Sequence, residues 1–88
     1  MEIGFTKAFY RAFKKKIAGR QEIESAFLDR MDIFKKNPFD SRLKTHKLSG
    51  PLDGWWSFSI EYNLRVVFSL ISKKKALFLD IGTHDEVY

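Results

Sequence analysis

Cysteine is absent from the sequence. Its absence excludes disulfides, thiolate metal sites and cysteine nucleophiles, and it is typical of proteins in a reducing compartment. No stretch approaches the ~20 apolar residues that a membrane span needs. Residues 1–16 contain no apolar run of the signal-peptide type. We therefore expect a cytoplasmic protein with no membrane segment.

Common enzyme motifs are also missing. The sequence has no glycine-rich phosphate loop, no nucleophile elbow and no HExxH pair. Its two histidines, His46 and His84, lie far apart, and neither has a second histidine at ligand spacing. A metal site would have to combine both of them with Asp80 or Asp85. We expect no metal and no cofactor.

Aromatic residues and positive charge are abundant instead. The 88 residues suffice for one domain, residues 1–88, and nine Phe, three Tyr and two Trp can fill a small core. Sixteen Lys and Arg exceed eleven Asp and Glu, which gives a net charge of +5. Such an excess favours a polyanionic partner such as nucleic acid, although a basic protein without one has the same composition.

The first half of the chain predicts two helices after a short strand at residues 2–5. Thr6 can cap the first helix, and Gly19 can end it in a left-handed conformation. The second helix is predicted over residues 21–36, before Asn37-Pro38, because the residue before a proline disfavours the helical conformation. Apolar residues recur at helical spacing in both: Phe9, Phe13, Ile17, Ile23, Ala26, Phe27, Met31 and Phe34.

The second half predicts a sheet. Side chains alternate with a period of two in residues 55–62, which places Trp56 on the core face and leaves Trp55 for stacking or a partner contact. The fold class is therefore α+β, a two-helix hairpin packed on an antiparallel, twisted β-sheet in the order β-α-α-β-β-β. Strands are expected at residues 43–48, 55–62, 64–72 and 76–82, with turns at 49–54 and 73–75 and a tail at 83–88.

Cationic residues gather in several clusters. Lysines in the last turn of a helix also complement its dipole, so those clusters have a structural explanation. Residues 42–47 are denser in cationic and titratable side chains and precede a glycine-rich turn, which is typical of a phosphate-binding rim. The candidate RNA-binding residues are Lys14, Lys15, Lys16, Arg42, Lys44, Lys47, Lys73 and Lys74.

Arg65 and His84 are the most informative polar residues. Arg65 interrupts an apolar strand, where it must pair, reach water or face a site that attracts positive charge. A guanidinium matches phosphate in a bidentate manner, whereas a pair with Glu61 or Asp80 across the sheet is the structural alternative. His84 follows the last strand, and an imidazole can move protons at a phosphate or a ribose hydroxyl.

Several stretches carry a resemblance to a known family. They are Leu43-Lys44 through Lys47-Leu48-Ser49-Gly50, Trp56-Ser57 through Ile60, Leu64-Arg65-Val66-Val67-Phe68 and Ile81-Gly82-Thr83-His84-Asp85-Glu86-Val87-Tyr88. Together they resemble the RelE/ParE superfamily of toxin–antitoxin toxins over nearly the whole chain. The arginine-containing strand and the Gly-Thr-His ending are most similar to its YoeB and YafQ branches.

The resemblance implies a ribosome-dependent mRNA endoribonuclease that uses no metal. In such enzymes the ribose 2′-OH attacks the adjacent phosphate. The resemblance assigns transition-state stabilisation to Arg65, proton transfer to His84 as general acid or base, and orientation of the nucleotide to Tyr88. His46 is the candidate for the complementary proton transfer, with Asp40 as an alternative. The lysine clusters would hold ribosomal RNA.

The sequence also departs from the family pattern. Phe58 and Ser59 stand where many relatives are basic, and Ser59 and Asn63 stand where YafQ-like toxins carry a histidine and an aspartate. The alternative function is a ParE-like toxin that inhibits DNA gyrase without catalysis, but His84 beside Arg65 favours the nuclease. The implied partners are an antitoxin, the ribosome with its rRNA, and mRNA.

Overall fold

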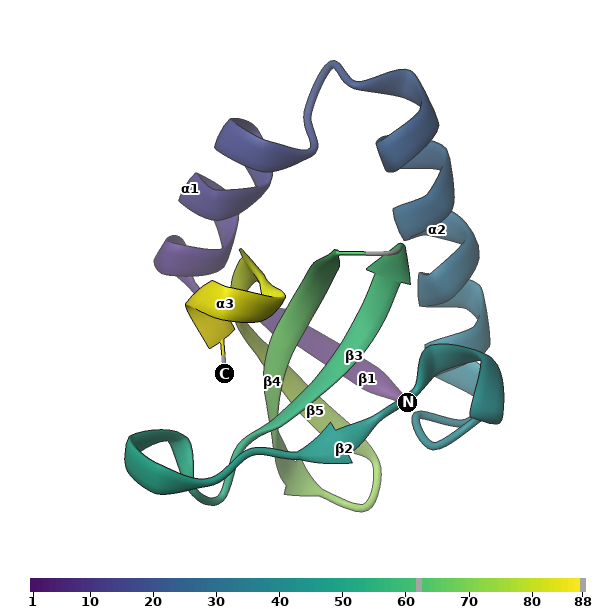
Figure 1. Cartoon of the computed structure of the whole chain (residues 1–88). Coiled ribbons are helices and arrows are strands. Elements are labelled where there is room, and N and C mark those ends of the chain that lie inside the picture. Colours follow the sequence, from purple (N-terminus) through teal and green to yellow (C-terminus); the bar gives the residue numbers. More distant parts are fainter. Residues whose placement is uncertain (62, 88) are drawn as a thin grey trace.

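The computed structural model describes residues 1–61 and 63–87 of the chain. A strand and two helices are followed by a run of strands and a one-turn helix (Figure 1). The elements are β1 (Glu2–Phe5), α1 (Lys7–Lys16), α2 (Gln21–Lys36), β2 (His46–Lys47), β3 (Trp56–Glu61), β4 (Leu64–Ser72), β5 (Lys75–Thr83) and α3 (His84–Val87), with single 3-10 turns at Ser41–Leu43 and Gly50–Leu52.

Both long helices form where the sequence predicts them. The Thr6 hydroxyl accepts a hydrogen bond of 3.1 Å from the Phe9 amide, which confirms the predicted cap of α1. α2 has the predicted bounds, Gln21–Lys36. α1 already ends at Lys16, and Gly19 takes a positive φ of 79° between the helices.

The five strands form one sheet in the order β1-β5-β4-β3-β2. The α+β class is confirmed, with α1 packed against β5 and α2 against β3. β1 lies parallel to β5, so the sheet is mixed, whereas the sequence predicted an antiparallel one. The helices and strands between β1 and β5 supply the long connection that a parallel pair requires.

The strand predicted over residues 43–48 is much shorter in the structure and covers His46–Lys47. The Asp40 carboxylate accepts a hydrogen bond of 2.9 Å from the Arg42 amide and starts a 3-10 turn in its place. Lys44 then takes a left-handed conformation with a φ of 52°, which is incompatible with an extended strand.

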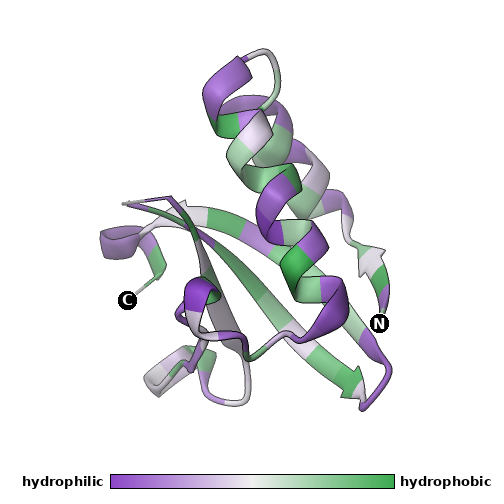
Figure 2. Cartoon of the chain, turned by 90° about the vertical axis from the view of Figure 1, so that its right-hand side faces the viewer, coloured by the Kyte–Doolittle hydropathy of each residue, from purple (hydrophilic) through white to green (hydrophobic). Residues whose placement is uncertain are grey.

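The main core lies between the two long helices and one face of the sheet. The fully buried Phe34 ring of α2 lies 5.1, 5.0 and 5.2 Å from the ring centroids of Phe58, Phe68 and Phe78. Trp56 packs against this core, as predicted, and the exposed Trp55 does not. Hydrophobic residues fill much of the strands in Figure 2, and hydrophilic ones recur along α2. None of the described helices is both long and apolar enough to cross a membrane.

Candidate active site

The face of the sheet that points away from α1 and α2 carries a smaller apolar cluster. In it Val67 of β4 packs with Leu48 and Val87. Arg65 lies two residues before Val67, so its side chain points to the same face. Its direct neighbour in β5 is Gly82. We call this face the site face.

His46 lies on the site face as well. It pairs with Ser57 of β3, which in turn pairs with Val67 of β4, and directly paired residues share a face. From strand spacing and rise, the Cα atoms of His46 and Arg65 are roughly 12 Å apart. Two long side chains at this separation can reach one nucleotide. The structure therefore brings together two residues that are distant in sequence.

The His46 ring is oriented by the backbone. Its Nδ1 lies 3.0 Å from the Lys44 carbonyl oxygen. A carbonyl can only accept, so Nδ1 carries the proton, and in the neutral ring Nε2 is then the nitrogen that accepts one.

His84 begins α3, which packs against β4 and β5 (yellow in Figure 1). A Cβ at Gly82 would lie 3.1 Å from Val87 Cγ2 and 3.2 Å from Glu86 Cβ, so α3 rests closely on the bare backbone of Gly82. Because Gly82 is the direct neighbour of Arg65, α3 stands beside Arg65 on the site face. His84 is exposed, and its amide donates to Asn63 Oδ1 at 3.4 Å.

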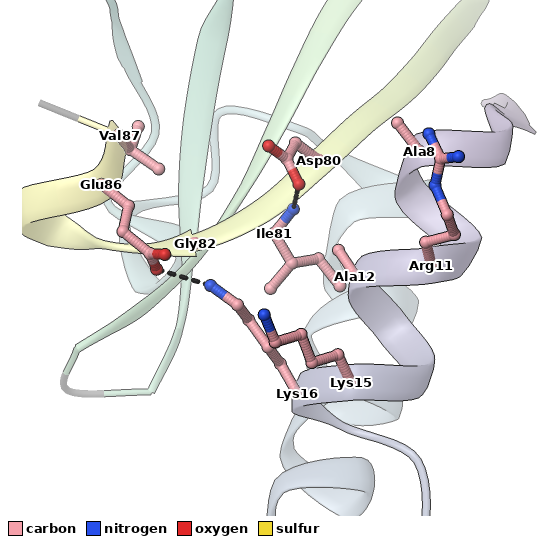
Figure 3. A pocket seen from close by; sticks show the side chains of 10 residues that line it. All are labelled: Ala8, Arg11, Ala12, Lys15, Lys16, Asp80, Ile81, Gly82, Glu86 and Val87. Carbon is pink, nitrogen blue, oxygen red and sulfur yellow. Dashed lines mark hydrogen bonds and ion pairs between the residues drawn. The ribbon is translucent and has the colours of Figure 1, made fainter.

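A capping box fixes the start of α3. The Thr83 amide donates to Glu86 Oε1 at 2.8 Å, and the Glu86 amide donates to the Thr83 hydroxyl at 3.3 Å. Lys16 of α1 forms an ion pair with the same Glu86 oxygen (Figure 3). Sequence reasoning did not assign Thr83 or Glu86, although Thr-x-x-Glu is the pattern that signals a capping box.

The pKa of the Glu86 carboxyl is lowered to about 2, mainly by the hydrogen bond from Lys16 and then by that from the Thr83 amide. The carboxylate is therefore charged at all physiological pH values. Since Lys16 is engaged with Glu86, its predicted role as an RNA-binding lysine competes with a structural one.

Asp40 forms a bidentate ion pair with Arg42. The Arg42 Nε and Nη2 atoms each lie 3.0 Å from a carboxylate oxygen of Asp40. This side-chain hydrogen bond, together with that from the Arg42 amide, lowers the pKa of Asp40 to about 2. A carboxylate this acidic accepts protons poorly at neutral pH, which favours His46 over Asp40 for proton transfer.

The cationic clusters do not all lie at the site. Lys44 lies two residues before His46, near the site face, whereas Lys47 pairs with Trp56 of the core and so its side chain points to the opposite face. Lys73 and Lys74 form the turn between β4 and β5, at the far end of β4 from Arg65. At the rise of a strand this separation is roughly 25 Å. The turn can contact RNA only well away from the bond that Arg65 would face.

Tyr88, predicted to orient the nucleotide, lies outside the described residues. Within residues 1–61 and 63–87, no three His, Asp or Glu side chains are grouped so that they could hold a metal ion.

Comparison with known proteins finds similarity in the fold but none in the sequence searches. No protein-family model and no curated protein matches this chain. A YoeB/ParE toxin from Agrobacterium tumefaciens superposes with a TM-score of 0.77 at 20% identity, over 96% of this chain and 99% of that chain. The chain has the YoeB/YafQ toxin fold.

Two toxin complexes share this YoeB/YafQ toxin fold. The YoeB-YefM complex from Staphylococcus aureus matches with a TM-score of 0.75 at 16% identity, covering 96% of this chain and 97% of that chain. The E. coli DinJ-YafQ toxin-antitoxin complex matches with a TM-score of 0.68 at 20% identity, covering 99% and 96%. The fold implied by the resemblance to the RelE/ParE superfamily is thus confirmed.

Proposed function

We propose that this protein is the toxin of a type II toxin–antitoxin system and cleaves mRNA on the ribosome. One observation carries the proposal: Arg65, His46 and the turn that bears His84 share one face of a sheet with the YoeB/YafQ toxin fold. A guanidinium and two imidazoles can together supply the cation, the base and the acid of phosphodiester cleavage by an internal hydroxyl.

The proposed reaction starts when one histidine takes the proton of a ribose 2′-OH. The 2′ oxygen forms a bond to the adjacent phosphorus, and the bond from phosphorus to the 5′ oxygen breaks. Arg65 stabilises the charge that develops on the phosphate oxygens, and the other histidine gives its proton to the leaving 5′ oxygen. The products are a 2′,3′-cyclic phosphate and a 5′-OH. Either histidine can serve as base, and Tyr88 would orient the nucleotide.

The proposed partners are an antitoxin, ribosomal RNA and mRNA. The YoeB-YefM and DinJ-YafQ complexes support the antitoxin, because both related folds occur bound to a second protein. The net charge of +5 favours an acidic antitoxin that covers the site face and a ribosomal site rich in phosphate. Lys44 would contribute at the rim of the site face.

A purified translation system tests the enzyme. Ribosomes stalled on a defined mRNA are incubated with the wild-type protein, and both ends created by cleavage are identified. We expect a cyclic phosphate and a 5′-OH, with the rate reduced about 10²–10³-fold in Arg65→Ala and about 10²–10⁴-fold in His84→Ala and His46→Ala.

Lys74→Gln is the matched control for this experiment. It removes one positive charge at the far turn, so its rate should remain close to that of the wild type. Intact mRNA together with inhibited DNA gyrase supercoiling would refute the nuclease and support the ParE-like alternative.

A further inference from the structure

The Lys16–Glu86 ion pair connects the two faces of the sheet. Lys16 belongs to α1, which covers the core face, whereas Glu86 belongs to α3 on the site face. The distance from Lys16 Nζ to Glu86 Oε1 is 2.5 Å. The Lys16 side chain is only 20% exposed, although lysine is among the least buried residue types.

The pair can form because the edge of β5 that faces away from β4 has no strand beside it at this level. β1 accompanies β5 as far as Phe78, which pairs with Phe5, and α1 then runs along the same edge. Between α1 and this part of β5 lies a groove of about 340 Å³, lined by both elements (Figure 3). Lys16 crosses this groove at Gly82 and reaches Glu86 (Figure 3).

Glu86 Oε1 has two donors at once, the Lys16 ammonium and the Thr83 amide. The first contact ties α3 to α1, and the second fixes the backbone immediately before His84. Their combination restrains a helix of only four residues. An isolated helical turn of this length is unstable in water, so α3 depends on such external contacts.

We propose that Lys16 and Glu86 are positioning residues, which hold His84 beside Arg65 by clamping α3 across the open edge of β5. This inference rests on the proposed function, because it concerns the geometry of the proposed proton transfer. It changes the assignment of Lys16 from a contact to RNA to a support of the site. A misplacement of about 1 Å can slow an enzyme about 10²-fold, so a clamp of this kind affects the rate strongly.

Lys15 provides a matched control for Lys16. The two lysines are neighbours on α1, and Lys15→Gln and Lys16→Gln remove the same charge, but Lys16 alone of the two pairs with Glu86. Glu86→Gln keeps an amide oxygen for the capping box and removes the charge that holds Lys16. The double variant Lys16→Gln/Glu86→Gln completes a cycle that measures the coupling of the two residues.

Two readouts are measured on all four variants. On stalled ribosomes we expect Lys16→Gln and Glu86→Gln each to lower kcat about 10- to 100-fold with little change in KM, and the double variant to be no slower than either. Amide hydrogen exchange observed by NMR should accelerate about tenfold or more at Thr83 and Glu86 in these variants. Lys15→Gln removes the same charge from a candidate RNA-binding residue that does not pair with Glu86, so it should act on KM rather than on kcat and leave amide exchange at Thr83 and Glu86 unchanged.

Three other outcomes would show which part of the proposal is wrong. If Lys15→Gln and Lys16→Gln raise KM equally and neither changes exchange, Lys16 is an RNA contact and the clamp is refuted. If effects on kcat add in the double variant, the residues do not act as a pair and the clamp is also refuted. If the wild type cleaves nothing, the proposed function fails, and the exchange data still decide whether the clamp exists.

Discussion

Gly82→Ala should slow cleavage more than its small effect on the free energy of unfolding explains. The new Cβ would lie 3.1 Å from Val87 Cγ2 and 3.2 Å from Glu86 Cβ, both in α3. Gly82 lies inside β5 and has no positive φ, so the backbone itself accommodates alanine. The strain therefore falls on α3, which must lift from the sheet and carry His84 away from Arg65.

The loss of folding stability is limited by the buried surface that α3 contributes. Val87 is 8% exposed, and burial of a valine contributes about 1.5–3 kcal/mol. Because α3 can detach from the sheet without unfolding the rest of the protein, the loss in the free energy of unfolding is limited to about this amount. Alanine in a strand regains about 0.5–1 kcal/mol relative to glycine. We expect the free energy of unfolding to fall by about 1–2 kcal/mol, and cleavage to slow about 100-fold.

Urea unfolding and cleavage on stalled ribosomes measure the two effects. Gly4→Ala is the matched control, because its Cβ would meet Leu77 Cδ1 at 3.2 Å, a similar overlap in β1 far from α3. It should cost similar stability without loss of cleavage. Full activity of Gly82→Ala at wild-type stability would refute the close packing of α3 on Gly82. Equal loss of activity in Gly82→Ala and Gly4→Ala would show that the effect on cleavage is not specific to α3.

Two further predictions concern stability. Phe34→Ala removes a fully buried ring that contacts three others, and it should lower the free energy of unfolding by about 3–5 kcal/mol in urea titrations; a loss below about 1 kcal/mol would contradict the described core. Asp40 and Glu86 have pKa values lowered to about 2 from 3.8 and 4.5, so their stabilisation is complete above pH 4.5 and is lost as the pH falls toward 2. The double variant Asp40→Asn/Glu86→Gln should lose less stability over that window, and a loss equal to that of the wild type would refute the two ion pairs.

The sequence predicts the regular elements well where local signals agree. Helix 21–36 and strand 64–72 have the predicted bounds, because periodicity and turn residues mark the same ends. Residues 43–48 differ because the Asp40 side chain stabilises a turn that competes with the strand. The parallel pairing of β1 with β5 is a long-range contact, which no local pattern specifies.

The candidate site was predictable in its residues more than in its geometry. Arg65 stands out because it interrupts an apolar strand, and His84 because it follows one. That His46 shares their face depends on the pairing of β2 with β3, and sequence spacing does not contain it. Glu86 could have been identified from Thr-x-x-Glu, whereas its pairing with Lys16, 70 residues away, is a tertiary contact.

The most direct test of the central claim is a map of mRNA 5′ ends in bacteria after induction of the protein. Wild type, Arg65→Ala and His84→Ala are compared at equal protein levels. We predict growth arrest by the wild type with cuts at fixed positions within codons, and loss of both in the two variants. Arrest without such cuts, or arrest that persists in His84→Ala, would contradict the assignment of a ribosome-dependent nuclease to this site.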